Sequence, residues 1–291
     1  MKYPIVQVRT SDGLWLHGLF IESPKSKTVF INIHGTASNF YEEDFIETMT
    51  VRFVPEGISM LSTNNRGTSV YDAWDKKGAA VEMFEDCLKD IDAWIEFAIE
   101  KGYSKIILSG HSLGTEKVVY YMGVGKYRDK VNAIVLLAPA DSPRWRYYDK
   151  TNTVPGTGET GKARIELQVK DAMKMIEDGK GDELMNRSSY AGLMPKSPKS
   201  LLNFLGENTE ILKTLPFHSG KLSMYGKINL PILVAIGDGH EYTGIPITDA
   251  LDMMKRDNPR TEAHQIKDCD HDFDGKEAEL MDIVTAFIKK I

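Results

Sequence analysis

The residues best suited to do chemistry lie in the five-residue segment 110–114, which reads Gly-His-Ser-Leu-Gly. This segment matches the G-x-S-x-G pattern, in which a serine sits on a sharp turn between a strand and a helix and exposes its hydroxyl group. The flanking glycines let other backbone segments approach the turn without a Cβ clash. An apolar run at 105–109 precedes the segment, and a helical pattern follows it at 113–123. The sequence therefore predicts that Ser112 is a nucleophile.

Strand-like and helix-like segments alternate along most of the chain, and these elements would position Ser112. Short apolar runs predict strands at 3–9, 14–21, 28–33, 57–63, 105–109, 131–138, 232–236 and 262–267. Apolar residues at helical spacing predict helices at 42–54, 80–100, 113–123, 246–257 and 276–290. Strands and helices that alternate in this way form right-handed crossovers. We therefore expect an α/β fold with a mostly parallel, doubly wound sheet.

The alternation of strands and helices is interrupted between residues 141 and 228. This stretch contains a segment rich in Pro, Gly and Thr at 151–162, a polar helical pattern at 163–178 and several later Gly, Pro and Ser breaks. It predicts a mainly helical cap that is inserted after the sixth strand. The core would then consist of residues 1–140 and 229–291.

Several motifs together make the chain resemble the α/β-hydrolase superfamily of serine hydrolases. His34-Gly35, after the third predicted strand, looks like the oxyanion loop of that fold, and the run Asn-Asn-Arg-Gly-Thr-Ser at 64–69 is similar to its usual Arg-Gly turn. The resemblance implies that the backbone N–H groups of Thr36 and Leu113 form an oxyanion hole, in which each donor contributes ~3–4 kcal/mol. We expect His34 itself to support the loop.

The α/β-hydrolase fold also implies an order for the base and the acid, since the acid and then the histidine follow the nucleophile. Of the seven histidines, His271 satisfies this order, because it lies between the last predicted strand and the last predicted helix. In relatives the acid commonly follows the penultimate strand as G-x-x-D, but here His240 occupies that place. Asp238 is therefore expected to orient His271, and Glu241 and Asp141 are the alternatives. Loss of such an acid can lower the rate by ~10⁴-fold.

These residues predict a serine hydrolase that cleaves a carboxylic ester or thioester through an acyl-enzyme on Ser112, with His271 as the base. One alternative is an acyltransferase, in which another nucleophile replaces water, and a second is a non-catalytic binding protein with an impaired triad. Within the superfamily the chain resembles small carboxylesterases and thioesterases, which implies that the cap acts as a lid over an acyl pocket. We expect no cofactor and no metal, because the carboxylates around Cys269 have no second cluster with ligand spacing.

The composition fits a soluble globular protein, with 42% hydrophobic and 27% charged residues and a net charge of −6. The acidic balance gives no electrostatic case for nucleic acid or an anionic membrane as partner. The partner expected from the serine-hydrolase motifs is a small-molecule acyl substrate. No apolar run approaches the ~20 residues that a membrane span requires. Only two cysteines are present, Cys87 and Cys269, which favours a reducing compartment and a cytoplasmic location. A homodimer is possible.

Overall fold

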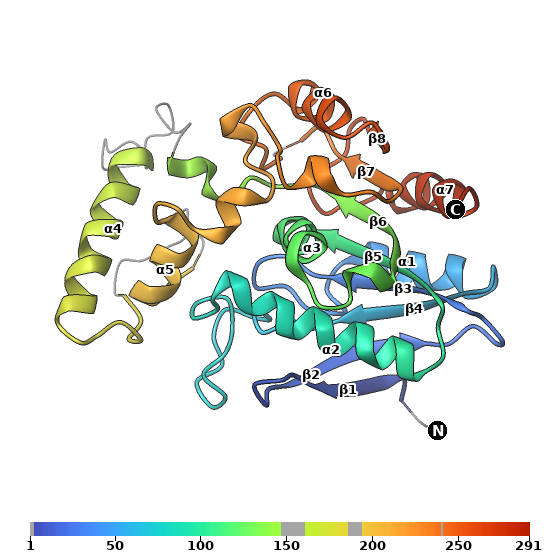
Figure 1. The fold of residues 1–291 in the computed structure, drawn as a ribbon, viewed down its shortest axis with the longest axis horizontal. Coiled ribbons are helices and arrows are strands. Elements are labelled where there is room, and N and C mark those ends of the chain that lie inside the picture. Colours follow the sequence, from blue (N-terminus) through green and yellow to red (C-terminus); the bar gives the residue numbers. More distant parts are fainter. Residues whose placement is uncertain (1–2, 147–160, 186–193, 240) are drawn as a thin grey trace.

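One eight-stranded sheet runs through the computed structural model, which describes residues 3–146, 161–185, 194–239 and 241–291 (Figure 1). The strand order is β1-β2-β4-β3-β5-β6-β7-β8. β2 pairs antiparallel with β1 and β4, and the remaining pairs are parallel, so the mostly parallel sheet is confirmed. The strands are β1 (Ile5–Arg9), β2 (Trp15–Ile21), β3 (Thr28–Ile33), β4 (Ile58–Thr63), β5 (Lys105–His111), β6 (Val131–Leu137), β7 (Ile232–Ile236) and β8 (Thr261–Gln265).

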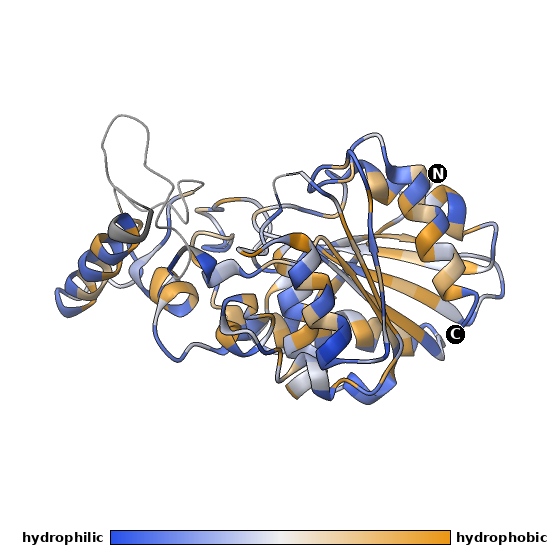
Figure 2. Cartoon of the chain, turned by 90° about the horizontal axis from the view of Figure 1, so that it is seen from above, coloured by the Kyte–Doolittle hydropathy of each residue, from blue (hydrophilic) through white to orange (hydrophobic). Residues whose placement is uncertain are grey.

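Two layers of helices cover the two faces of this sheet. α1 (Asp44–Phe53) and α7 (Glu277–Ile288) bury their apolar residues on one face. α2 (Cys87–Glu100), α3 (Leu113–Val124) and α6 (Ile247–Asp257) do so on the other face. The central strands are therefore buried on both sides, which explains why they appear in the sequence as nearly continuous apolar runs. Figure 2 shows these apolar strands between helices whose outer faces are hydrophilic.

The candidate site residues lie at the carboxyl ends of the parallel strands. Ser112 follows β5 directly, Asp141 follows β6, Glu241 follows β7 and His271 follows β8. Thr36 comes shortly after β3. Since the carboxyl ends of parallel strands meet at one edge of the sheet, loops from distant parts of the sequence converge there.

The helix predicted at 80–100 begins later than expected, at Cys87, after the short turn η1 (Phe84–Asp86). The residues before this turn leave the helical path and bring Glu82 into the interior. There the Glu82 carboxylate accepts a hydrogen bond from Lys117 Nζ of α3 over 2.9 Å, and Lys117 Nζ also donates to Asn65 Oδ1 over 3.1 Å. Both charged side chains are almost fully buried. A buried charge of this kind is retained only when a partner neutralises it, so Glu82 is held beside α3.

Between β6 and β7 the described residues form helices and turns. They are η3 (Ser142–Arg146), α4 (Gly161–Glu177), α5 (Pro198–Leu205), η5 (Glu210–Lys213), η6 (Phe217–Ser219) and η7 (Tyr225–Lys227). Ser197 caps α5 and donates its backbone N–H to Ala80 O over 2.8 Å, while Ser200 Oγ donates to Glu82 O over 2.7 Å. These bonds fasten α5 to the core, whereas α4 lies on its outer side, farther from the sheet (Figure 1). Among the described residues no helix combines the length and apolarity needed to cross a membrane.

Candidate active site

The turn between β5 and α3 holds Ser112 in a strained conformation. Its φ of 53° and ψ of −125° lie in a region that non-glycine residues rarely adopt. Such strain persists only where the surrounding structure enforces it, and it is concentrated at functional sites. The turn places the side chain of Ser112 at the beginning of α3, where the helix dipole favours negative charge.

Three glycines make this turn sterically feasible. A Cβ atom on Gly110 would overlap the backbone of Gly114, and one on Gly114 would overlap the carbonyl group of Ile33. A Cβ on Gly35 would lie 2.8 Å from Ser112 Cβ. The glycines are therefore required by close backbone approach, as the motif predicted.

His271 is held by a carboxylate that is almost completely buried. Its Nδ1 donates to Glu241 Oε2 over 2.8 Å, and the exposed fractions of the two side chains are 13% and 1%. The other oxygen, Glu241 Oε1, accepts the backbone N–H of Gly237 over 3.0 Å. Both carboxylate oxygens thus have partners, and the tautomer with the proton on Nδ1 leaves Nε2 of His271 able to accept a proton.

Asp238, the acid expected to orient His271, is located elsewhere, so this expectation is corrected. The exposed Asp238 side chain accepts the backbone N–H of Cys269 over 3.1 Å at Oδ1. This bond lowers the pKa of Asp238 and ties its loop to the loop of His271. The difference arises because Asp238 follows β7 too closely to reach the imidazole, whereas Glu241 lies three residues farther along and has a longer side chain.

Asp141, the third candidate acid, has a different histidine as its partner. Asp141 Oδ2 accepts hydrogen bonds from His218 Nδ1 over 2.7 Å and from the His218 backbone N–H over 3.0 Å. The histidine paired with Asp141 was not singled out as functional by sequence reasoning, because the two residues are separated by most of the insertion. Of the three candidates, Glu241 is the one that contacts His271.

One pocket of about 390 Å³ contains both Ser112 and His271 in its lining. Thr36 lies in the same lining, and Leu113, the first residue of α3, directly follows the serine. His271 Nε2 is buried and has no hydrogen-bond partner within the described part of the chain. In enzymes without substrate the catalytic hydrogen bonds are often long, and they tighten when substrate binds. This arrangement places the Ser112 hydroxyl group and the His271 imidazole in one cavity.

Burial controls the protonation of the His271–Glu241 pair. Loss of solvation raises the pKa of Glu241 to about 7 and lowers the pKa of His271 to about 4. Because the two groups share a hydrogen bond, protons leave them in steps that belong to the pair. At neutral pH the imidazole is therefore neutral and able to act as a base.

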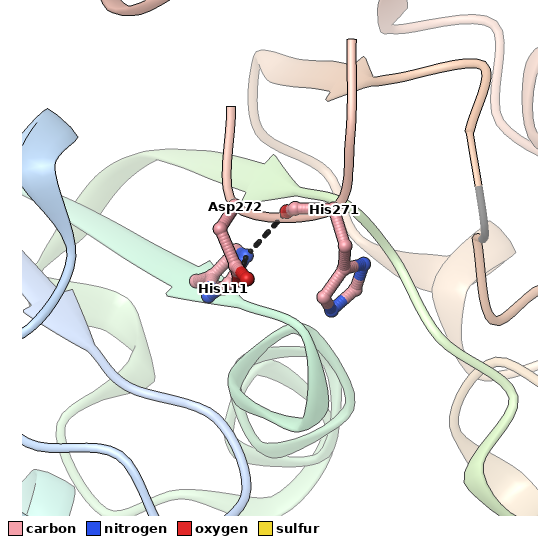
Figure 3. Close-up of side chains that lie close together, drawn as sticks. All are labelled: His111, His271 and Asp272. Carbon is pink, nitrogen blue, oxygen red and sulfur yellow. Dashed lines mark hydrogen bonds and ion pairs between the residues drawn. The ribbon is translucent and has the colours of Figure 1, made fainter. Parts of the chain in front are cut away.

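His111, the residue before the nucleophile, fixes the loop that carries His271. Its Nε2 donates to the carbonyl oxygen of His271 over 2.9 Å and lies 3.8 Å from Asp272 Oδ1 (Figure 3). Potential metal-ligand atoms of these three residues lie within 4.8 Å of one another. However, His111 Nε2 is bonded to the His271 carbonyl group, and His271 Nδ1 is bonded to Glu241. We therefore interpret His111 as a support for the histidine loop.

His34 supports the loop expected to form the oxyanion hole. Its Nδ1 donates to Gly35 O over 2.8 Å, and its Nε2 accepts the backbone N–H of Asn65 over 3.1 Å. Burial lowers the pKa of His34 to about 3, so the ring is neutral, as these two bonds require. The Asn-Asn-Arg-Gly-Thr-Ser run is thereby joined to the loop that contains Thr36.

Comparisons with known proteins identify the family of the chain. The family described as Serine aminopeptidase, S33, matches residues 24–189, which is more than half of the chain. Comparison with curated protein sequences gave no match.

Several solved structures are similar to the chain over nearly its whole length. Est1E from Butyrivibrio proteoclasticus has a TM-score of 0.66 at 14% identity, and the alignment covers 99% of this chain and 98% of Est1E. The esterase Pf2001 from Pyrococcus furiosus has a TM-score of 0.61 at 17% identity, with 99% and 91% covered. The α/β hydrolase GrgF from Penicillium sp. sh18 has a TM-score of 0.62 at 15% identity, with 98% and 97% covered. At these identities the likeness shows the fold, which is that of the α/β hydrolases.

Proposed function

Since this chain belongs to the α/β-hydrolase family described as Serine aminopeptidase, S33, we propose that it is a serine esterase that cleaves a carboxylic ester or thioester. Ser112 Oγ attacks the carbonyl carbon while His271 Nε2 takes its proton, and the imidazolium then gives that proton to the departing alcohol or thiol. Water repeats the sequence on the acyl-enzyme and releases the acid. Glu241 orients the imidazole, and the N–H groups of Thr36 and Leu113 bind the oxyanion.

The observation that carries this proposal is the hydrogen bond from His271, which lines the pocket of the strained Ser112, to the buried Glu241. The Nδ1–Oε2 distance of 2.8 Å fixes the imidazole, while Nε2 has no partner among the described residues. A positioned base with a free nitrogen is what a serine needs to lose its proton at neutral pH. The serine, the carboxylate and the histidine come from three separate parts of the chain, at the ends of β5, β7 and β8.

The lining of the pocket supports an acyl substrate of modest size. Its volume of about 390 Å³ lies toward the lower end of the range of ~300–1,000 Å³ typical of small-molecule sites. Ala37, Val70, Ala140 and Met194 give it apolar walls. Met194 belongs to the insertion, as do the lining residues Ser142 and Arg144, so we propose that the insertion determines which acyl groups are accepted.

A labelling experiment combined with a substrate series tests this proposal. A fluorophosphonate probe should modify the protein in a one-to-one ratio, and peptide mass spectrometry should locate the adduct at Ser112. Turnover is then measured with p-nitrophenyl acetate, butyrate and octanoate, with a butyryl thioester and with methyl ferulate, since Est1E has been solved with ferulic acid bound. An amino-acid p-nitroanilide represents the amide alternative that the family description suggests. Absence of labelling and of turnover, or faster cleavage of the amide, would contradict the proposal.

The pH dependence of the reaction follows from the His271–Glu241 pair. Because catalysis requires the deprotonated pair, we expect kcat/KM to rise with pH through an apparent pKa of about 7 and to level off above about pH 8. The profile is measured with p-nitrophenyl butyrate between about pH 5 and about pH 9. In Glu241→Gln the inflection should shift toward the pKa of His271, which burial lowers to about 4. An unchanged inflection in this variant would assign it to another group.

A further inference from the structure

A second pocket of about 770 Å³ lies beside the C-terminal end of α3, whereas Ser112 precedes the first residue of that helix. Within the described chain it shares no lining residue with the pocket of Ser112. Its walls come from the C-terminal end of α3, from Arg128 at the start of the turn η2 (Arg128–Lys130) and from residues of the segment 212–228 of the insertion. The pocket that contains Ser112 has about half this volume. The second pocket is thus large enough for a ligand of its own.

The charged residues in this lining are all basic. Arg128, Lys213, Lys221 and Lys227 line the pocket, and no carboxylate does so among the residues that the structure describes. Lys213 forms an ion pair with Glu210, which is outside the lining. For the other three, no ion pair is found within the described ranges.

This concentration of positive charge is notable in a chain with a net charge of −6. The nearby carboxylate of Asp257 is bonded to Arg256 and accepts the backbone N–H of Leu222, and these bonds, with a smaller contribution from Lys221, lower its pKa. Cations that line a concave site raise the local concentration of anions there. The charge of the pocket therefore favours an anionic ligand.

The same pocket also has an apolar and adaptable wall. Met122, Met224 and Ile228 contribute to it. Gly123 lets Met224 approach closely, because a Cβ at that position would lie 2.9 Å from Met224 Sδ. Methionine side chains adjust to ligands of irregular shape. The pocket thus combines an apolar wall with cationic groups.

A hydrogen bond to a buried carboxylate fixes a histidine in the wall of the second pocket. His218 lines the second pocket, and its ring is held by the fully buried Asp141 over 2.7 Å. Ala140 and Ser142, the neighbours of Asp141 in sequence, line the pocket of Ser112. The part of the wall that His218 forms is therefore held in place by a buried carboxylate.

We propose that the second pocket binds an amphipathic organic anion, in which one anionic head group is joined to an apolar body. The basic side chains would bind the head group, and the methionine wall would bind the body. Carboxylic acids released by ester hydrolysis belong to this chemical class, but the binding itself does not depend on a reaction at Ser112.

Binding of 8-anilinonaphthalene-1-sulfonate, whose fluorescence increases in apolar sites, tests the proposal. The wild type should bind one equivalent, and Lys221→Gln/Lys227→Gln should weaken the affinity about fivefold, as expected for two exposed charge contacts. Lys126→Gln/Lys130→Gln removes the same charge from neighbouring positions outside the lining and should leave the affinity unchanged. Ser223→Trp, which fills the pocket and keeps its charges, should also weaken binding.

Displacement of the probe distinguishes an anion site from an apolar patch. Dodecanoate should displace the probe, whereas dodecyltrimethylammonium, with the same chain and the opposite charge, should not. Equal displacement by both compounds, equal loss of affinity in the two double variants, or full binding in Ser223→Trp would each overturn the proposal. So would the absence of binding to the wild type. Circular dichroism and thermal unfolding of every variant verify that it is folded.

Discussion

Replacing Ser112 by Ala is expected to lower kcat by about 10⁶-fold, and replacing His271 by Ala should have an effect of the same size. The two side chains act as one unit, because the hydroxyl group is a weak nucleophile until the imidazole removes its proton. The double variant should therefore be no slower than either single variant. Residual catalysis of about 10³–10⁴-fold over water should remain, since the oxyanion donors and the binding pocket are intact.

The comparison requires single-turnover and steady-state kinetics with p-nitrophenyl butyrate on folded proteins. Ser38→Ala is a matched control, because Ser38 lines the same pocket but its hydroxyl group already donates to Glu43 over 2.8 Å. This control should keep most of the activity and all of the fluorophosphonate labelling. If Ser112→Ala retained the activity of the control, the nucleophile would have to be sought elsewhere. Multiplicative losses in the Ser112/His271 double variant would instead show that the two groups act separately.

Glu241→Gln is expected to lower kcat by about 10⁴-fold, the loss known for an amide that replaces a triad carboxylate. The amide preserves the size of the side chain but no longer stabilises the imidazolium, and its NH₂ group favours the wrong tautomer of His271. Asp238→Asn is the matched control, because it makes the same chemical change in the same loop. The Asn side chain can still accept the backbone N–H of Cys269, so Asp238→Asn should stay close to the wild type.

Two further measurements make the assignment of the acid decisive. Glu241→Asp keeps the charge but shortens the side chain, so it should fall between the wild type and Glu241→Gln in kcat. Asp141→Asn should lower thermal stability through its contact with His218 while leaving the apparent pKa of catalysis unchanged. A larger loss of kcat in Asp238→Asn than in Glu241→Gln would reverse the assignment made from the geometry.

Much of the site depends on interactions that rigidify the loops around Ser112. Burial of the Lys117–Glu82 pair ties α3 to the segment before α2, and Lys117 Nζ also reaches Asn65 beside the oxyanion loop. On the opposite side, His111 Nε2 bonds to the backbone of His271. These contacts come from residues that do not touch the reacting atoms, and they provide the rigidity that a strained turn requires.

The sequence by itself determined the class of fold, and it predicted Ser112 as the nucleophile and His271 as the base, because each prediction rests on a local pattern or on the order of the elements. The glycines around Ser112 are needed by a turn of only five residues, and the pattern of such a turn is contained in the sequence. The alternation of apolar runs with helical periods specified the parallel sheet, since strands buried on both faces must be continuously apolar. The position of His271 followed from the order of the elements in the α/β-hydrolase fold.

Only the tertiary structure decided which carboxylate contacts His271. Asp141, Asp238 and Glu241 all follow strands that end at the same edge of the sheet, so the sequence placed each of them near His271. Which carboxylate reaches the imidazole depends on the direction of each loop and on the length of the side chain, and neither is encoded in a local pattern. The start of α2 was determined in the same way, because Glu82 leaves the helical path to neutralise Lys117, which lies 35 positions away in sequence. A contact between residues so far apart in sequence depends on how the elements pack in the folded chain, and no local sequence pattern indicates it.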